Sequence, residues 1–432
     1  MFKNISKSFS AATLVALVAI IAAALFSYGA SQPLNTASTA SSDAHTQRPG
    51  LLLVDYRNLG EGPDGVALID LDPESAQFGE IIQNVEIGVG VLPHHLYFNH
   101  DQSKLYTTAL GGEHLYEIFL EHGPDGTPVI TSIEPIDTGE NIVGEDIYFT
   151  RDGSRFYMTF LGGQGGDQGG SVGVFDAQSN ELITSITAPV PEDPASGQPF
   201  LMYTHGISAN EDLGLLMVTS TIHPDLATGA GNTVTFIDLE TNELIKTQLV
   251  GESYEEISAP VEVLMLRDEL PPYALTTTML GGDIWIAAYD ESTQSYGEFQ
   301  KAIEGDDFGL SWPLELYIHT NQLSETELYV SFGKPGTVHV YSFENLPELT
   351  LKRSLPAAAG AHHMVFFTTA SGREVMVIQN NLLNLDELND GSLMVVDIHT
   401  GDVLATLDLA GEHGLMPESI ESAYGHGHDY HH

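Results

Sequence analysis

The chain has 432 residues, and its 60 Asp and Glu against 14 Lys and Arg give a formal net charge of −46 at neutral pH. Such a charge excludes binding to nucleic acids and to anionic membrane surfaces, because both are held through clusters of Lys and Arg. The chain has no cysteine, so disulfides, thiolate nucleophiles and thiolate metal sites are excluded as well. Any metal site must use the 18 histidines and the carboxylates.

Residues 1–31 are typical of a secretory signal peptide. Lys3 and Lys7 precede the apolar run Ala11–Phe26, and the small residues around Ala30 and Ser31 offer a cleavage site. An uncleaved anchor is the alternative, although the run is at the short end for a membrane span. We therefore expect a periplasmic or secreted protein. Residues 32–50, rich in Ser, Thr and Ala, are expected to form a flexible linker.

From Leu51 onward the chain repeats a unit of roughly 50 residues, which is a period typical of propeller blades. Each unit contains a short strand, a polar turn and a second strand. Clear copies begin at Leu96, Ile147, Ile207, Leu316 and Met364. No stretch after the apolar run has a sustained helical period, so the sequence predicts an all-β fold.

A second repeated feature is an outer hairpin, in which an Asp is followed four residues later by Asn or Gly. The copies are Asp176 to Asn180, Asp238 to Asn242 and Asp397 to Gly401, each between alternating apolar segments. These residue types favour tight turns.

The predicted inner strands set the number of blades. Their starts are at Leu96, Ile147, Ile207, Val263, Leu316 and Met364. Leu51–Gly88 adds three strands without an inner one, and Met416–Glu421 can return to supply it. Such closure by the N- and C-terminal strands removes an exposed sheet edge. We predict a seven-bladed β-propeller over residues 51–424, with six blades plus an accessory hairpin as the alternative.

The two residues before each inner-strand start contain His or an acid in every blade. They are His94-His95, Glu145-Asp146, His205-Gly206, Val261-Glu262, Leu314-Glu315 and His362-His363, and the proposed closing strand gives Glu418-Ser419. Because equivalent positions of the inner strands converge on the central channel, these side chains predict a metal site without sulfur. The candidate ligands are His94, His95, His205, His362, His363 and Glu145. The alternative is a polar channel whose side chains bond one another and water.

Alternation along a strand predicts that one residue of each pair faces the channel and the other faces away. The register favours His95, Glu262, Glu315 and His363, and His205 then needs a slip of one residue. Copper is the favoured metal, because it binds most tightly among divalent first-row ions, with iron or zinc as alternatives.

Other histidines carry weaker signals. The His-rich tail over residues 425–432 can bind Cu(II), Ni(II) or Zn(II), or can be incidental. The scattered histidines, among them His319, His339 and His399, are expected at the surface or in turns.

Several segments resemble the selenium-binding protein family, which includes copper-dependent methanethiol oxidases. The most specific are Tyr56-Arg57-Asn58, Gly62-Pro63-Asp64 and Ile69–Ser75, which are similar to the family's opening. His94-His95 stands where the family has a paired His, and the match spans most of Leu51–Leu409. The chain departs from the family in lacking the Cys pair that commonly follows, and in carrying His205 and His362-His363.

The resemblance implies oxidation of a small thiol by O2 to an aldehyde, sulfide and peroxide. From the residues we hypothesise that copper is held by His95, His205 and His363, and that Glu262 or Glu315 accepts the substrate proton. A non-enzymatic propeller that binds metal or a partner is the alternative, and an Fe(II) oxygenase is the third possibility. The sequence does not predict an oligomeric state.

Overall fold

The computed structural model describes residues 48–163, 169–187, 202–222, 230–253, 257–268 and 270–425. The predicted signal peptide, residues 32–47 of the predicted linker and the histidines of the tail lie outside these ranges. Within the described part of the chain, no helix is long and apolar enough to cross a membrane.

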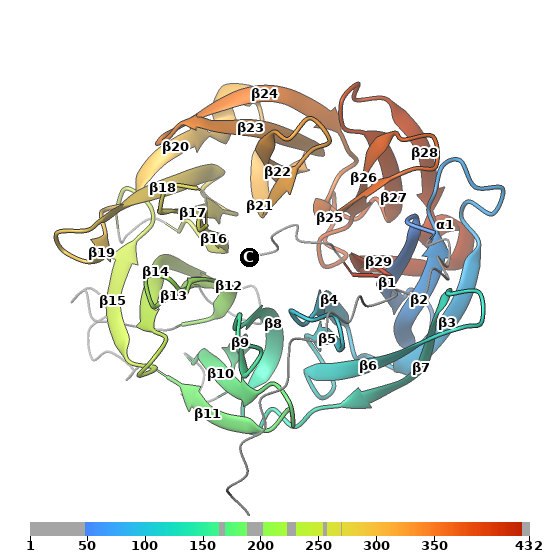
Figure 1. Ribbon diagram of the computed structural model, residues 1–432, viewed down its shortest axis with the longest axis horizontal. Coiled ribbons are helices and arrows are strands. Elements are labelled where there is room, and N and C mark those ends of the chain that lie inside the picture. The colour runs from blue at the N-terminus through green and yellow to red at the C-terminus, as the bar shows by residue number, and fades with distance from the viewer. Residues whose placement is uncertain are drawn as a thin grey trace, which may run out of the picture. The chain divides into compact units, whose positions relative to one another are not determined.

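Seven antiparallel β-sheets surround a central axis as the blades of a propeller (Figure 1). This confirms the prediction of an all-β, seven-bladed fold. Six sheets have four strands, and the sheet that begins with β16 has five. The described residues contain two short helical segments, the 3-10 helix η3 (Gly305–Phe308) and the α-helix α1 (Leu409–His413).

Each blade has one strand at the axis and the others successively further out. The inner strands are β4 (Pro93–Phe98), β8 (Ile142–Phe149), β12 (Thr204–Asn210), β16 (Pro260–Met265), β21 (Ser311–Thr320), β25 (Ala361–Thr368) and β29 (Leu415–Ser422). The second strands are β1 (Leu51–Asn58), β5 (Leu105–Ala109), β9 (Arg155–Gly162), β13 (Leu215–Ile222), β17 (Tyr273–Thr278), β22 (Thr326–Lys334) and β26 (Glu374–Asn380).

The third strands are β2 (Asp64–Asp70), β6 (Leu115–His122), β10 (Ser171–Asp176), β14 (Ala230–Asp238), β18 (Asp283–Asp290), β23 (Thr337–Asn345) and β27 (Ser392–Asp397). The outer strands are β3 (Ile81–Gly88), β7 (Pro128–Pro135), β11 (Leu182–Ile186), β15 (Leu244–Leu249), β20 (Gln300–Glu304), β24 (Glu348–Pro356) and β28 (Val403–Asp408). The short β19 (Ser295–Tyr296) pairs with the far end of β18.

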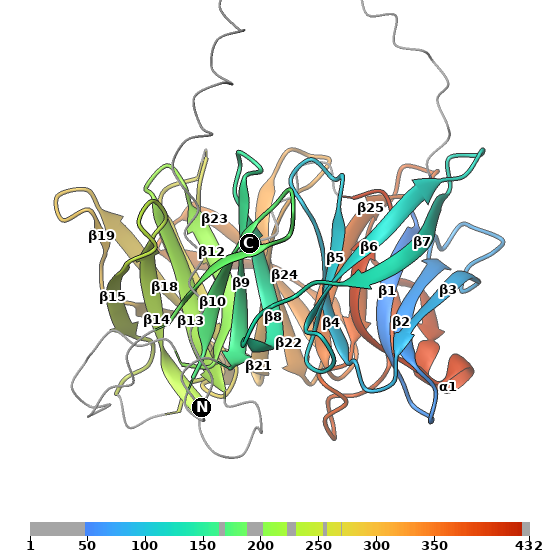
Figure 2. The same ribbon diagram turned by 90° about the horizontal axis from the view of Figure 1, so that it is seen from below.

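One blade is built from both ends of the described chain. β29 pairs antiparallel with β1, so that Ser422 lies opposite Leu52 and Leu415 opposite Asn58. The segment Met416–Glu421 therefore supplies the inner strand of the first blade, as predicted. In the side view, α1 lies at the rim of the ring just before this closing strand (Figure 2).

Apolar side chains pack between neighbouring blades. Val54 of β1 and Ala67 of β2 share one fully buried cluster with Val365, Val377 and Val395 of the preceding blade. Because side chains alternate along each strand, every sheet can present an apolar face to each neighbour. The apolar contacts between blades therefore do not use the polar residues at the axis.

The outer hairpins contain the turn residues that the sequence indicated. Asn180, Asn242 and Gly401 have φ values of 60°, 60° and 74°. In each hairpin the backbone N–H of this residue donates to the carbonyl of the Asp four residues earlier, as between Asn180 and Asp176 at 2.8 Å. Asn and Gly adopt this left-handed conformation most readily, which explains the repeated pattern.

Candidate metal centre

The inner strands share a β-bulge at the residue pairs that the sequence singled out. In β8, Glu145 and Asp146 together oppose the single residue Thr159 of β9. The same register shift occurs at the equivalent pair in β12, β16, β21 and β25, and one extra residue is inserted in β4 and β29. A bulge changes the direction in which a strand's side chains point.

Side chains of the second strands hold these bulges. Thr159 accepts a hydrogen bond from the backbone N–H of Asp146 at 3.0 Å, and Thr219 accepts one from Gly206 at 2.9 Å. The equivalent acceptors are Thr277, Ser331, Gln379 and Asp55. Thr219 also donates to the carbonyl of Val261 in the next blade at 2.9 Å. These bonds fix the bulges and link adjacent blades.

The bulges bring both members of each histidine pair to the axis. The rings of His94 and His95 are stacked with centroids 4.2 Å apart, and those of His362 and His363 are 3.9 Å apart. All four are buried. The expectation that one residue of each pair faces away is therefore wrong for β4 and β25, because the extra residue interrupts the alternation.

The eight residues singled out by sequence as ligands or proton acceptors come together around the axis. We call them the axial cluster: His94, His95, His205, His362, His363, Glu145, Glu262 and Glu315. Seven of them form two overlapping sets, in each of which one atom per residue lies within 4.8 Å of the others. The first donor group is His94, His95, Glu145 and His205, and the second donor group is His95, Glu315, His362 and His363.

Contacts in the first donor group have the spacing of ligands around one ion. Glu145 Oε2 lies 3.3 Å from His94 Nε2 and 3.3 Å from His205 Nε2. Among the described residues, however, this oxygen has no hydrogen-bond partner. Ligands at about 2.0 to 2.1 Å from a tetrahedral ion lie about 3.3 to 3.4 Å from one another. The donor set and its spacing therefore fit a transition-metal ion.

Glu262 and Glu315 both contact imidazole nitrogens. Glu262 Oε1 lies 3.1 Å from His205 Nδ1. Glu315 Oε1 lies 3.0 Å from His362 Nε2 and 3.8 Å from His363 Nδ1. The predicted proton acceptors thus border the candidate ligands of both donor groups.

Tyr97 and Asp146 determine which nitrogen of His95 can coordinate. The hydroxyl of Tyr97 donates to Asp146 Oδ1 at 2.6 Å, and His95 Nδ1 lies 2.6 Å from the same hydroxyl. Burial and then Asp146 raise the pKa of Tyr97 well above its ordinary value, so the phenol keeps its proton. Because the hydroxyl uses that proton in its hydrogen bond to Asp146, His95 Nδ1 must donate its own proton to the hydroxyl oxygen. His95 Nε2 is left with a lone pair and, within the described chain, no hydrogen-bond partner.

Burial controls the protonation of the centre. It lowers the pKa of His94 and of His95 well below the usual value, and the neighbouring histidines lower it further. Burial also raises the pKa of Glu145 to about 7. Neutral imidazole is the form that binds metal ions, and an ion bound here would displace any proton from Glu145.

The closing blade contributes a carboxylate with different partners. Glu418 Oε1 lies 3.1 Å from Arg57 Nε, and its Oε2 accepts a hydrogen bond from Asn381 at 3.0 Å. Glu418 occupies the bulge of β29 but does not belong to either donor group.

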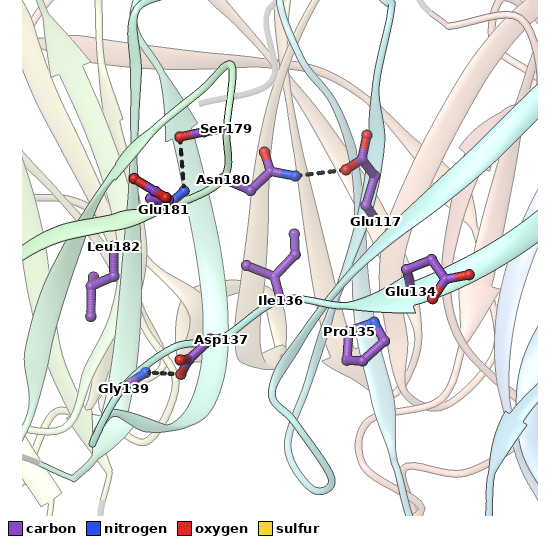
Figure 3. A pocket seen from close by; sticks show the side chains of 10 residues that line it. All are labelled: Glu117, Glu134, Pro135, Ile136, Asp137, Gly139, Ser179, Asn180, Glu181 and Leu182. Atoms are coloured by element: carbon purple, nitrogen blue, oxygen red, sulfur yellow. Dashed lines mark hydrogen bonds between the residues drawn. The ribbon is translucent and has the colours of Figure 1, made fainter.

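Two hollows differ in their relation to the axial cluster. One, of about 20 Å³, is lined by His95, Tyr97, Tyr317 and His363 together with residues of β29, and has room for roughly one water molecule. The other, of about 620 Å³, lies on the outside between β6–β7 and the β10–β11 hairpin (Figure 3). Its lining includes the exposed carboxylates Glu134, Asp137 and Glu181, and no donor group of the described residues lies there.

Sequence reasoning missed some supporting residues. The role of Tyr97 was not identified, although an aromatic residue two positions after the pair recurs in Tyr317, whose hydroxyl lies 3.5 Å from His363 Nδ1. The expectation that scattered histidines lie at the surface is wrong for His319 and His339, which are 5% and 4% exposed. Both have polar partners inside their own blades or the next, so burial leaves them satisfied.

Comparison with known proteins gives distant similarity. No protein-family model matches the chain. It is 21% identical over 300 residues to a methanethiol oxidase of Hyphomicrobium sp, which covers 66% of this chain and 64% of that protein. It is 22% identical over 275 residues to a methanethiol oxidase of Ruegeria pomeroyi, with coverage of 57% and 59%. The chain thus spans less than two thirds of the length of both relatives.

Solved structures share the propeller fold. A hypothetical selenium-binding protein from Sulfolobus tokodaii superposes with a TM-score of 0.66 at 16% identity, covering 88% of this chain and 94% of that one. The periplasmic gluconolactonase of Pseudomonas aeruginosa gives 0.54 at 15% identity, covering 83% and 94%. Together with the sequence relatives, these findings confirm that the chain resembles, at low identity, the selenium-binding proteins and methanethiol oxidases.

Proposed function

We propose that this protein is an exported, copper-dependent oxidase that acts on a small thiol with O2 at the axial cluster. The observation that carries the proposal is that buried histidines and glutamates converge at the spacing of metal ligands. In particular, Glu145 Oε2 lies 3.3 Å from two imidazole nitrogens and has no hydrogen-bond partner among the described residues. The names of the distant relatives support the choice of substrate. The overall reaction consumes one primary thiol, one O2 and one water, and it gives one aldehyde, one hydrogen sulfide and one hydrogen peroxide.

The chain's own residues have separate tasks in this proposal. The donor groups would hold copper, which would supply the redox chemistry that couples oxidation of the thiol to reduction of O2. Tyr97 keeps His95 Nε2 available, and Glu262 or Glu315 accepts the proton of the thiol. The buried surroundings exclude bulk water. Because the chain has no cysteine, no protein thiol competes with the substrate for the metal.

The histidines of the tail could bind copper as well, so any test needs a protein in which they are replaced. We would use a full-length background in which His426, His428, His431 and His432 are replaced by Ala, loaded with Cu(II) and desalted. Oxygen uptake with methanethiol, together with sulfide and peroxide formation, is expected from this protein and not from its metal-free form. Copper-loaded protein that is inert towards methanethiol under O2 would contradict the proposed reaction.

Export is proposed from Lys3, Lys7 and the apolar run Ala11–Phe26. The mature protein recovered from the periplasm or medium should begin after Ala30 or Ser31. An intact N-terminus on membrane-bound protein would favour the anchor instead.

A non-enzymatic metal-binding propeller is the second candidate. The specific observation in its favour is the cavity of about 20 Å³ beside the cluster, which leaves room for roughly one water molecule. Copper bound in stoichiometric amount without thiol-dependent oxygen uptake would select this function over the oxidase.

A further inference from the structure

The axial cluster offers more ligands than one ion can use, and they divide into two sets. Two ligands of one ion, each about 2.1 Å from it, lie at most about 4.2 Å apart. The atoms of each donor group lie within 4.8 Å of one another, which is close to the size of one coordination shell. The seven residues together do not form one such set.

The groups come from opposite parts of the ring. His94, Glu145 and His205 belong to the consecutive inner strands β4, β8 and β12, whereas Glu315, His362 and His363 belong to β21 and β25. His95 is the one residue common to both. Its Nδ1 is engaged by Tyr97, so it has a single lone pair, on Nε2, and can coordinate one ion at a time.

Charge balance points in the same direction. Glu145, Glu262, Glu315 and the adjacent Asp146 are buried and bring four negative charges when ionised, whereas the coordinating imidazoles are neutral. One divalent ion would leave a net charge of −2 among these groups. Two divalent ions leave them neutral. Burying uncompensated charge is costly.

We infer that the axial cluster binds two metal ions, one in each donor group, rather than a single ion. The ion that takes His95 Nε2 has four protein ligands, and the other has three. The second ion therefore keeps an open position, as catalytic metal sites do. This inference rests on the proposed function only in requiring metal at the axis.

Metal stoichiometry tests the inference with Cu(II) alone as the probe. In the full-length background without tail histidines, we expect two copper ions per chain after loading and desalting. Two neighbouring Cu(II) ions couple magnetically, so the electron paramagnetic resonance spin count should fall well below the copper content. This measurement needs no variant within the cluster.

Paired variants then locate the ions. Glu145→Gln/His205→Ala should remove the ion of the first donor group, and His362→Ala/His363→Ala the ion of the second. Each is expected to bind one copper per chain with one spin per copper. His339→Ala, a buried histidine outside the cluster, is the matched control and should keep two.

The outcomes separate this inference from the proposed function. One copper per chain in the background protein, lost in both paired variants, would mean one ion held jointly and would overturn the two-ion inference while leaving a metal-dependent oxidase intact. No copper at the axis would overturn both. Two coppers without thiol oxidation would support the inference and contradict the oxidase.

Discussion

Two sets of His and Glu in this protein have similar composition and different geometry. In the outer set, Glu374 of β26 lies 2.8 Å from His319 Nε2 and 3.0 Å from His399 Nε2, and it accepts a hydrogen bond from Gln322 N–H at 3.0 Å. His319 also stacks on Phe366, with centroids 4.3 Å apart. In the axial cluster, Glu145 lies 3.3 Å from two imidazole nitrogens without a hydrogen bond to either.

The difference shows that residue types alone do not identify a metal site. The outer set satisfies its polar atoms internally, which is what a structural cluster requires. In the axial cluster, Glu145 Oε2 and His95 Nε2 lie beside other donor atoms and have no hydrogen-bond partner among the described residues. Substitutions in the two sets should therefore affect different properties.

The largest effect is expected from His95→Ala/His363→Ala, because each donor group then loses a ligand and the second loses two. Elemental analysis in the background without tail histidines should show the copper content fall by at least half, because the second donor group keeps only Glu315 and His362 whereas the first keeps three ligands. His319→Ala/His399→Ala is the control and should keep its full copper. If the axial variant retains full copper, the cluster is not the binding site and the comparison fails.

Glu374→Ala should affect stability and spare metal binding. It removes the acceptor for the buried His319 and for the exposed His399 and Gln322, at a cost of about 2 kcal/mol. Urea unfolding of the metal-free protein measures the loss. Glu374→Gln keeps one acceptor and should lose less. Reduced copper content in either variant would show that the outer set is coupled to the centre.

Tyr97→Phe tests the orientation of His95 within the centre. Without the hydroxyl, Nδ1 is no longer held as the donor, and copper affinity should weaken about 10- to 100-fold. Competition with a chelator of known affinity gives the value. Tyr106→Phe, which loses a hydrogen bond of its hydroxyl to Asn180 at the blade's periphery, should leave affinity unchanged. Equal copper affinity of the Tyr97 variant and its parent would show that Tyr97 does not orient His95 for metal binding.

Glu327 extends the comparison to an outer carboxylate paired with cations. Burial raises the pKa of Glu327, but the hydrogen bonds from Arg353 and Lys352 outweigh this effect and lower the pKa to about 2. The contribution of Glu327 to the free energy of unfolding is therefore complete above the pKa of the unfolded chain, near 4.5, and is lost as the pH falls towards 2. After allowance for solvent screening, we expect about 1 kcal/mol.

A pH series of unfolding measurements checks this smallest effect. The stability difference between the parent and Glu327→Gln should be present at pH 6 and disappear near pH 2. A difference that is independent of pH would mean that the carboxylate's charge does not stabilise the blade.

Most of the fold was predictable from the sequence because the blade repeat, the outer Asp-to-Asn turns and the returning strand at Met416 are local patterns. The members of the axial cluster were predictable from their common register. Their orientation was not, because strict alternation does not reveal the extra residue that turns both His94 and His95 inward. Likewise, His319 and Tyr97 form hydrogen bonds with Glu374 and Asp146 on other strands, which become neighbours only in the folded chain.

The most direct test of the central claim is anomalous diffraction at the copper edge, from crystals of the copper-loaded protein without tail histidines. A metal in the axial cluster predicts an anomalous peak on the propeller axis, about 2 Å from His95 Nε2 or from the nitrogens of His362 and His363. Copper-loaded crystals with no peak on the axis, or with peaks confined to the outer surface, would contradict the account.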